Sequence, residues 1–479
     1  MIRNVNGSKS AVIVGSGPNG LAAAIALARA GVHVTLFEAA PQAGGCLRSE
    51  ALTLPDCIHD AGAAVFPLAK ASPFFRTLPL EQHGLTWIEP DIPIAHPLDN
   101  GDAAALLHDI DATASLLGED GKRWNQWMRP LLAAWPSLLQ DALSPLLRVP
   151  RYPLYMARFG VLALQSARSI AMQLKTAQAR TLFAGLAAHA NVPLEMTASA
   201  GAGLMLAAAA HSTGWPIARG GAQSIANAML SLLQELGAEI VLQHPVASLR
   251  DLPKTDALLL DVTPRQFVSI ASDALSASEA KVLSDVRSGP GMCKVDWVLS
   301  SPIPWQAELP RRAGTVHLGG SLEEIAASER DAWNGVASDR PYVLLSQPSL
   351  FDVTRAPVGV HTAWAYCHVP NGSTEDFTQR IEDQIERFAP GFRNTILVRH
   401  VRTATDMERW NPNLLGGDIS GGAMTLKQIV LRTRHRTALR GVYLCSSSTA
   451  PGGGVHGMCG WHAACAAAAD MKLPRLRLT

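Results

Sequence analysis

The chain has 479 residues, room for about three domain-sized units whose cores are large enough to need no disulfide or metal for stability. Its 41 Lys and Arg balance 40 Asp and Glu, which argues against a nucleic-acid-binding protein, because such a protein needs a basic surface. Charged residues make up only 17% of the chain, against ~25% in an ordinary domain. We therefore expect some apolar surface to face a lipid, a membrane or another subunit.

The chain starts with polar residues, so we expect no secretory signal peptide there. It contains no uninterrupted run of 18 apolar residues, so we also expect no membrane-spanning helix. Seven cysteines, none in a Cys-x-x-Cys pair, indicate free thiols in a reducing compartment, and no metal-ligand spacing is present. We expect a cytoplasmic protein able to associate with the inner face of a membrane, and no bound metal.

The first predicted elements are a buried parallel strand over 10–14, an Ala-rich helix that ends at Gly31, and a second strand over 32–37. A GxGxxG loop precedes the helix and an acid follows the second strand. In this order the glycines let the backbone approach a pyrophosphate, the helix N-terminus offers free N–H groups, and the acid accepts from a ribose hydroxyl. The predicted dinucleotide contacts are Gly15, Ser16, Gly17, Pro18, Asn19, Gly20, Glu38 and Ala39.

A second diglycine, Gly44-Gly45, lies shortly after the predicted ribose acid, with Arg48 three residues further on. Glycines here again allow close backbone approach, as an extended cofactor such as FAD needs, whereas a simple NAD fold would continue into a crossover helix. The alternative is an ordinary turn, with Arg48 on the surface.

Charge is scarce in the middle of the chain. Residues 130–147 contain one charged residue and 181–218 contain one, while Arg148, Arg151, Arg158, Arg168 and Lys175 lie between them among apolar residues and prolines. For 130–175 we favour a lid over an apolar cavity, a peripheral membrane contact or a subunit interface. The alternative for 181–218 is a buried core helix.

Histidines in apolar surroundings are the first candidates for proton transfer. His211 ends the long uncharged run, and His368 follows Trp364-Ala-Tyr366-Cys, whose aromatic rings are able to line a pocket. We name His211, His368 and Tyr366 as candidate catalytic residues. A hydrogen-bonded structural histidine and an aromatic core are the alternative interpretations.

Near the C-terminus a strand over 441–445 is followed by a glycine-rich loop and a helical run. The loop repeats GxGxxG, but only 22 residues follow Gly457, too few for a second nucleotide-binding unit. We interpret the loop as a helix N-terminus directed at an electron-rich flavin ring, with a packing turn as the alternative. Its predicted contacts are Gly453, Gly454, Val455 and Gly457.

Several segments together resemble the phytoene desaturase-like FAD-dependent oxidoreductases, in the branch that contains pyridine nucleotide-disulfide oxidoreductase domain-containing protein 2. They are GSGPNGLAAAIALARAG, FEAAPQAGG, HDAGAAVFPLAKASPFF, GWPIARGGAQSIANAM, KVDWVLSSPIPW, WAYCHVP, QIERFAPGF and YLCSSSTAPGGGVHG. The resemblance implies an α/β fold with a glutathione-reductase-like Rossmann FAD-binding domain and an inserted α+β substrate domain with a helical cap. It also implies that Val246 pairs its backbone with the adenine. The disulfide in the branch's name is unsupported, because this chain has no dithiol motif, and the Arg that often precedes the diglycine is also missing.

We therefore expect a discontinuous FAD-binding domain of residues 1–75, 216–265 and 400–479, and a substrate and cap domain of 76–215 and 266–399. The predicted activity is FAD-dependent dehydrogenation, desaturation or oxidation, with a hydride taken from a C–H bond of a lipophilic, isoprenoid or carotenoid-like substrate. The electron acceptor, oxygen, a quinone or another compound, stays open, as does assembly into a homo-oligomer. The alternatives are a redox-neutral double-bond isomerase, an FAD-stabilised interaction protein without turnover, and an amine oxidase.

Overall fold

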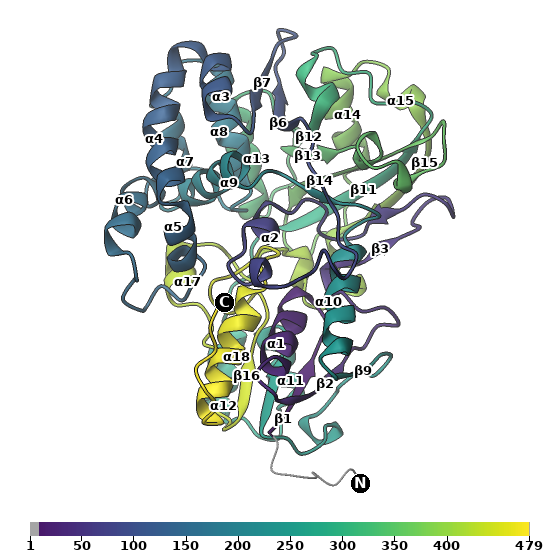
Figure 1. Ribbon diagram of the computed structural model, residues 1–479. Coiled ribbons are helices and arrows are strands. Elements are labelled where there is room, and N and C mark those ends of the chain that lie inside the picture. Colours follow the sequence, from purple (N-terminus) through teal and green to yellow (C-terminus); the bar gives the residue numbers. More distant parts are fainter. Residues whose placement is uncertain (1–8, 479) are drawn as a thin grey trace.

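The computed structural model describes residues 9–478 and places the longer strands in two sheets (Figure 1). The first sheet is five-stranded and parallel throughout, in the order β16-β10-β1-β2-β9. Its strands are β1 (Ser10–Val14), β2 (His33–Phe37), β9 (Glu239–Val241), β10 (Ala257–Leu260) and β16 (Val442–Leu444). Because all five run the same way, their carboxyl ends meet at one edge, where open α/β sheets bind ligands.

Helices cover both faces of this sheet. Side chains of β1 alternate between two cores, with Ile13 packed under α1 (Pro18–Ala28) and Val12 packed with Phe267 of α11 (Pro264–Ile270). On the first face α1 lies between α10 (Gln223–Glu235) and α18 (Met458–Asp470). Gly460 permits the close approach of α18 to α1, since a side chain there would collide with the carbonyl oxygen of Asn19.

The second sheet has seven strands in the order β15-β11-β14-β13-β12-β6-β7, antiparallel except for the parallel pair β12 and β6. The strands are β6 (Ile92–Pro97), β7 (Ala103–Leu106), β11 (Gly291–Leu299), β12 (Ala313–Leu318), β13 (Val343–Ser346), β14 (His361–Val369) and β15 (Ile396–Arg402). One face packs apolar side chains against α14 (Thr378–Phe388) and α15 (Phe392–Thr395). The other face carries aromatic and titratable side chains, and this difference between the faces positions the site.

The remaining helices lie mostly beside the second sheet, on the left of Figure 1. They are α2 (Pro67–Ala71), α3 (Ile110–Leu116), α4 (Gly121–Ala133), α5 (Trp135–Ala142), α6 (Pro153–Ala163), α7 (Ala167–Ala171), α8 (Ala177–Ala188), α9 (Ala200–Ser212), α12 (Ala277–Ser284), α13 (Leu322–Trp333), α16 (Ala404–Trp410) and α17 (Leu426–Val430). Two short strand pairs, β3 (Ser49–Glu50) with β4 (His59–Asp60) and β5 (Trp87–Ile88) with β8 (Ile217–Ala218), connect the two parts.

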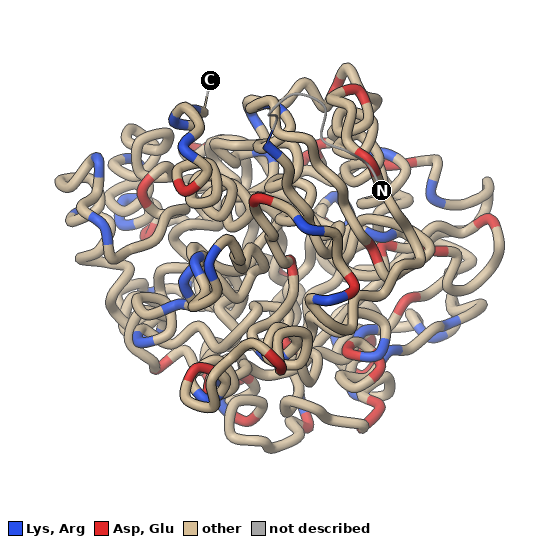
Figure 2. Tube along the Cα trace, turned by 90° about the horizontal axis from the view of Figure 1, so that it is seen from below, with Lys and Arg blue, Asp and Glu red and all other residues tan. Residues whose placement is uncertain are grey.

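Both uncharged stretches are largely buried, and in 130–147 the side chains of Leu131, Trp135 and Leu138 belong to the main core. Most of 181–218 forms α8 and α9, whose side chains belong to the main core, so the core-helix alternative describes it. By contrast, the chain after α5 exposes many apolar side chains. None of the helices within residues 9–478 is long and apolar enough to span a bilayer. Over the face seen in Figure 2, positive and negative residues are interspersed.

Candidate functional site

A cavity of about 670 Å³ runs from the carboxyl edge of the parallel sheet to the polar face of the seven-stranded sheet. At one end it is lined by the loop after β1 and by the end of β2. At the other end it is lined by side chains of β12, β13 and β14. A single space therefore joins the predicted nucleotide site to a second region built from distant parts of the chain.

The glycine loop forms a cradle that side chains would fill. Gly15 has a φ of +95°, which only glycine adopts without strain. A Cβ on Gly17 would lie 2.6 Å from Oδ2 of Asp261, and one on Gly45 would lie 2.9 Å from Cα of Gly17. Backbone segments from three parts of the chain thus meet at the N-terminus of α1. This arrangement fits the pyrophosphate of a dinucleotide.

Glu38 ends β2 and is held in place by backbone and hydroxyl donors. Its Oε2 accepts from Ser16 N at 2.9 Å and from Ser16 Oγ at 2.5 Å, and its Oε1 accepts from Ala40 N at 2.8 Å. Ser16 Oγ also accepts from Gly44 N at 3.0 Å, so one serine ties the ribose acid to the diglycine turn. The carboxylate lines the cavity, where ribose hydroxyls are able to donate to it.

Most of the predicted cofactor contacts line this cavity. They are Gly15, Ser16, Gly17, Pro18, Asn19, Glu38, Ala39, Gly45, Arg48, Val246, Gly454 and Val455. Four others lie behind the cavity wall: Gly20 under the Gly15 carbonyl, Gly44 against Ala226, Gly453 against Ser420 and Gly457 against Phe75. Direct contact of these four with a cofactor stays a prediction, and the structure gives them a packing role instead.

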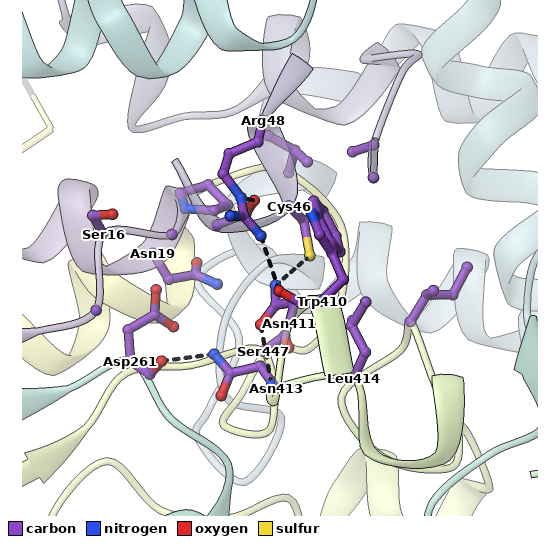
Figure 3. A pocket seen from close by; sticks show the side chains of 18 of the residues that line it. Ser16, Asn19, Cys46, Arg48, Asp261, Trp410, Asn411, Asn413, Leu414 and Ser447 are labelled. Carbon is purple, nitrogen blue, oxygen red and sulfur yellow. Dashed lines mark hydrogen bonds between the residues drawn. The ribbon is translucent and has the colours of Figure 1, made fainter. Parts of the chain in front are cut away.

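Asp261 is a cavity residue that the sequence analysis did not identify. It follows β10 directly, its Oδ2 accepts from Gly20 N at 2.9 Å, and its carbonyl accepts from Asn413 Nδ2 at 2.8 Å (Figure 3). Burial, helped by the charge of Glu38, raises the pKa of Asp261 to about 7. An acid directly after the apolar run Ala257–Leu260 was a usable signal, because the ends of parallel strands meet at one edge.

We expect Asp261 to make FAD affinity depend on pH. Below pH 7 its carboxyl is neutral, whereas above pH 7 its negative charge opposes the anionic pyrophosphate. Affinity should therefore fall as the pH rises from 7 to 9, by about tenfold per unit at most. Asp261→Asn keeps the oxygen that accepts from Gly20 N, so its affinity should not fall over this range. Fluorescence titration of the apoprotein with FAD measures both profiles, and parallel profiles would contradict the prediction.

A second group of residues joins the diglycine segment to the end of α16. The Arg48 guanidinium lies 4.4 Å from the Trp410 ring centroid, and Nη2 of Arg48 donates to the Trp410 carbonyl at 3.0 Å (Figure 3). Asn411 Nδ2 lies 3.1 Å from Cys46 Sγ. Burial raises the pKa of the Cys46 thiol to about 11, so this thiol stays protonated and unreactive at neutral pH. No motif marked residues 410–413, which tertiary packing brings to the cavity.

Side chains at neighbouring register positions of β11, β14, β13 and β12 form the far end of the cavity. Lys294 of β11 pairs with Tyr366 of β14, Tyr366 pairs with Leu344 of β13, and Leu344 pairs with His317 of β12. Neighbouring positions in register share a face, and Tyr366 and Leu344 line the cavity. The Trp364 and Tyr366 rings are stacked at 6.1 Å and 12°. The two aromatic walls predicted from the sequence thus stand side by side.

Buried charged groups lie behind this aromatic pair. Lys294 Nζ is paired with Asp296, and His59 Nδ1 lies 3.6 Å from the same carboxylate. Burial lowers the pKa of Lys294, although the Asp296 carboxylate opposes the change. Lys294 Nζ also lies 5.9 Å from the Trp364 ring centroid. The signal for Lys294 and Asp296 was their place, two apart, inside the otherwise apolar run Gly291–Leu299.

Two of the three candidate catalytic residues do not line the cavity. His211 accepts from Trp124 Nε1 at 3.0 Å, and His368 Nδ1 lies 2.8 Å from Glu329. Both rings are buried and hydrogen-bonded, as expected of structural histidines. Their catalytic role stays a prediction, and their positions outside the cavity do not favour it. Tyr366 does line the cavity. His189, which the sequence analysis passed over, also lines it, and its Nε2 lies 3.1 Å from Nε2 of His317.

Comparison with known proteins gives a consistent picture. A sequence model described as flavin containing amine oxidoreductase matches residues 19–472. Pyridine nucleotide-disulfide oxidoreductase domain-containing protein 2 of Rattus norvegicus is 26% identical, over 96% of this chain and 94% of that protein. The 4,4'-diapolycopen-4-al dehydrogenase of Metabacillus indicus is 36% identical, over 25% of this chain and 26% of that protein.

Among solved structures, a putrescine oxidase bound to putrescine has a TM-score of 0.63 at 18% identity, over 97% of this chain and 99% of that chain. At this identity the likeness shows the fold alone. It confirms the predicted fold class, a Rossmann-type FAD-binding domain combined with a second sheet domain, but it does not test the predicted cap.

Proposed function

Because the chain belongs to the flavin containing amine oxidoreductase family and is an FAD-dependent oxidoreductase, we propose that it takes a hydride from a C–H bond of an uncharged, lipophilic substrate. The family match and the relatives confirm the resemblance, the cofactor and the enzyme class predicted from the sequence. The proposal adds the chemical class of the substrate. We name isoprenoid or carotenoid-like compounds as its first members.

The observation that carries the proposal is the absence of a carboxylate from the far end of the cavity. Among described lining residues the carboxylates are those of Glu38 and Asp261, both at the nucleotide end. The lining of the far end is mostly apolar: Val65, Phe66, Pro67, Leu68, Leu206, Trp215, Met292, Leu344, Trp364 and Tyr366. Burying an ammonium group there without a countercharge would be costly, whereas burying a hydrocarbon is favourable.

Several polar atoms at this end already have partners within the protein, whereas Nδ1 of His189 and the Tyr366 hydroxyl have none among residues 9–478. Thr315 Oγ1 accepts from Trp215 Nε1 at 2.9 Å, and the His189–His317 contact occupies Nε2 of both rings. Few hydrogen-bonding groups therefore remain to recognise a polar substrate. The partial relative from Metabacillus indicus, named for a carotenoid aldehyde, supports the same class.

FAD, when bound, accepts the hydride, and the residues of this chain hold the substrate and exclude water. The stacked Trp364 and Tyr366 rings offer a flat wall for a planar polyene or alkene. His189 also lies at this end, and burial lowers its pKa to about 3, so its neutral ring accepts a proton only from a much stronger acid, such as a substrate that has lost hydride. Its Nδ1 makes no hydrogen bond with residues 9–478 and is the atom we propose to take the substrate proton.

Amine oxidation is the second candidate, and the same aromatic pair favours it. Two parallel rings present negative faces, which attract an ammonium group even where no acid is present. The family match points the same way, since its description names amines.

Anaerobic bleaching of the flavin separates the candidates. Matched substrates differing only in the head group, such as a long-chain allylic alcohol and the amine of the same chain, should bleach the flavin at different rates. We expect the uncharged compound to react at least about tenfold faster, and faster reaction of the amine would overturn the proposal. Conversion that requires prereduced flavin and consumes no acceptor would indicate the isomerase. If no compound bleaches the flavin, the remaining interpretation is an FAD-stabilised interaction protein without turnover.

A further inference from the structure

We propose that residues 146–172 form a docking surface for an anionic lipid bilayer, and we call this segment the apolar lobe. Eight of the eighteen large apolar side chains that the described residues expose lie in it. They are Leu146, Leu147, Val149, Leu154, Tyr155, Val161, Leu164 and Met172. Such a concentration of exposed apolar side chains marks an interaction surface. The inference concerns a surface and does not depend on the proposed substrate.

The helix α6 carries apolar side chains on two opposite faces. Met156 and Phe159 pack against the main core, on the same side as buried Ala163. Leu154 and Val161 lie on the opposite side of the helix at exposures of 83% and 70%. A surface helix of a soluble domain normally has polar residues on this outer face. The outer face of α6 therefore resembles a helix that lies on a lipid surface.

The loop before α6 is held in a shape that keeps its apolar residues outside. The buried carboxylate of Asp141 accepts from Arg151 N at 2.9 Å, from Tyr152 N at 2.7 Å and from Arg148 Nη2 at 3.2 Å. Leu147 and Val149, at exposures of 67% and 89%, project from this closed loop. Because the loop is ordered by Asp141, its insertion into lipid costs little conformational entropy.

The positive charge of the apolar lobe favours anionic lipid as its partner. No Asp or Glu occurs between Asp141 and Glu195, and the exposed side chains of Arg151, Arg158 and Arg168 make no ion pair with residues 9–478. A second copy docked by a twofold axis would bring these arginines together without a countercharge. Anionic lipid head groups pair with the arginines while acyl chains take up the apolar side chains. The Tyr152 and Tyr155 rings, stacked at 6.2 Å, are the type of side chain that lies at that boundary.

The lobe lies at the outer edge of the molecule, where α6 is drawn furthest left in Figure 1. It is also near the cavity, because α6 packs on α9 and Leu206 of α9 lines the cavity wall. Docking through the lobe would therefore place the cavity close to the lipid, one helix away from it.

Vesicle flotation of the FAD-loaded protein tests the proposal. The full chain should float with phosphatidylcholine vesicles containing phosphatidylglycerol, and binding should weaken at high salt. The triple variant Leu147→Ser, Val149→Ser and Leu154→Ser should bind at least about tenfold more weakly with flavin content unchanged. The matched control Val282→Ser, Val353→Ser and Val358→Ser, with exposures of 71%, 84% and 107% outside the lobe, should bind like the unmodified chain.

The charged residues are tested separately. Arg151→Gln, Arg158→Gln and Arg168→Gln together should remove the preference for phosphatidylglycerol over phosphatidylcholine alone. Equal flotation of the lobe variant and the control would overturn the proposal. It would also be overturned if the unmodified chain stayed free of vesicles, or if light scattering showed a dimer that the lobe variant alone converts to monomer.

Discussion

Replacing Gly20 by Ala is expected to abolish FAD binding in a chain that still folds. A Cβ at position 20 would collide with the carbonyl oxygen of Gly15 and come within 3.1 Å of Oδ2 of Asp261. The first atom belongs to backbone, so the loop and the start of α1 have to move apart. That movement displaces the N–H groups that face the pyrophosphate, and we expect affinity to fall by about two orders of magnitude or more.

The control for this change lies at the other end of the same helix. Gly31→Ala also alters a glycine of the first βαβ unit, and a Cβ there meets nothing within 4 Å. Its φ of +79° is strained for alanine, so a loss of about 1 kcal/mol of stability is expected with flavin content intact. The ratio of flavin to protein absorbance and the far-UV circular dichroism of both variants measure the outcome. Full flavin content in Gly20→Ala would contradict the packing argument.

Acidification from pH 7 to pH 4 is expected to unfold the protein sharply. Burial lowers the pKa of seven histidines to about 3 or 4, and it also lowers the pKa of His317 well below its ordinary value. The seven are His59, His96, His189, His211, His435, His456 and His462. In the unfolded chain the same rings bind protons near pH 6.5.

Proton binding to the folded and unfolded chains determines how the free energy of unfolding changes with pH. Below pH 6.5 the unfolded chain binds protons that the folded chain cannot, so the free energy of unfolding falls as pH falls, down to the folded pKa values. Each such ring costs up to about 1.4 kcal/mol per pH unit in that window. Asp261 has the opposite effect between pH 4 and 7, since its raised pKa keeps a proton on the folded state. Burial also raises the pKa of Asp418, so two carboxyl groups oppose eight histidines, and the histidines determine the sign.

His96 gives the sharpest single test of this explanation. Its ring is fully buried, and neither ring nitrogen has a hydrogen-bond partner among residues 9–478. His96→Leu should raise the free energy of unfolding at pH 5 by about 1–2 kcal/mol more than at pH 8. The exposed His33 is the control, and His33→Leu should change both values little. Urea unfolding at the two pH values, with FAD in excess, measures the difference. Equal effects of His96→Leu at both values would exclude this source of acid sensitivity.

The nucleotide end of the site could be predicted because its residues are close in sequence. Gly15, Gly17 and Glu38 lie within one strand–loop–helix–strand unit, where local backbone geometry alone brings them together. Asp261 was missed, since it joins them only through the pairing of β10 with β1, 241 residues from its partner Gly20.

The roles of the histidines, by contrast, could not be predicted from the sequence. His211 and His368 stood in apolar surroundings, which fits a catalytic base and a structural histidine equally well. Their partners decided between these, and Trp124 and Glu329 lie 87 and 39 residues away in the chain. His189 and Lys294 reach the far end of the site through helix packing and strand register, which no local pattern records.

Local motifs and the family resemblance that they carry thus determined the cofactor and the fold class, and composition revealed the segments poor in charge or in acids. Only the tertiary structure decided what those segments do. Residues 181–188 and 200–211 lack charge because they pack inside the core, whereas 146–164 lack acids while exposing apolar side chains. In the sequence both are simply segments rich in apolar residues. Burial depends on which surfaces meet, and that is set by contacts between segments far apart in the chain.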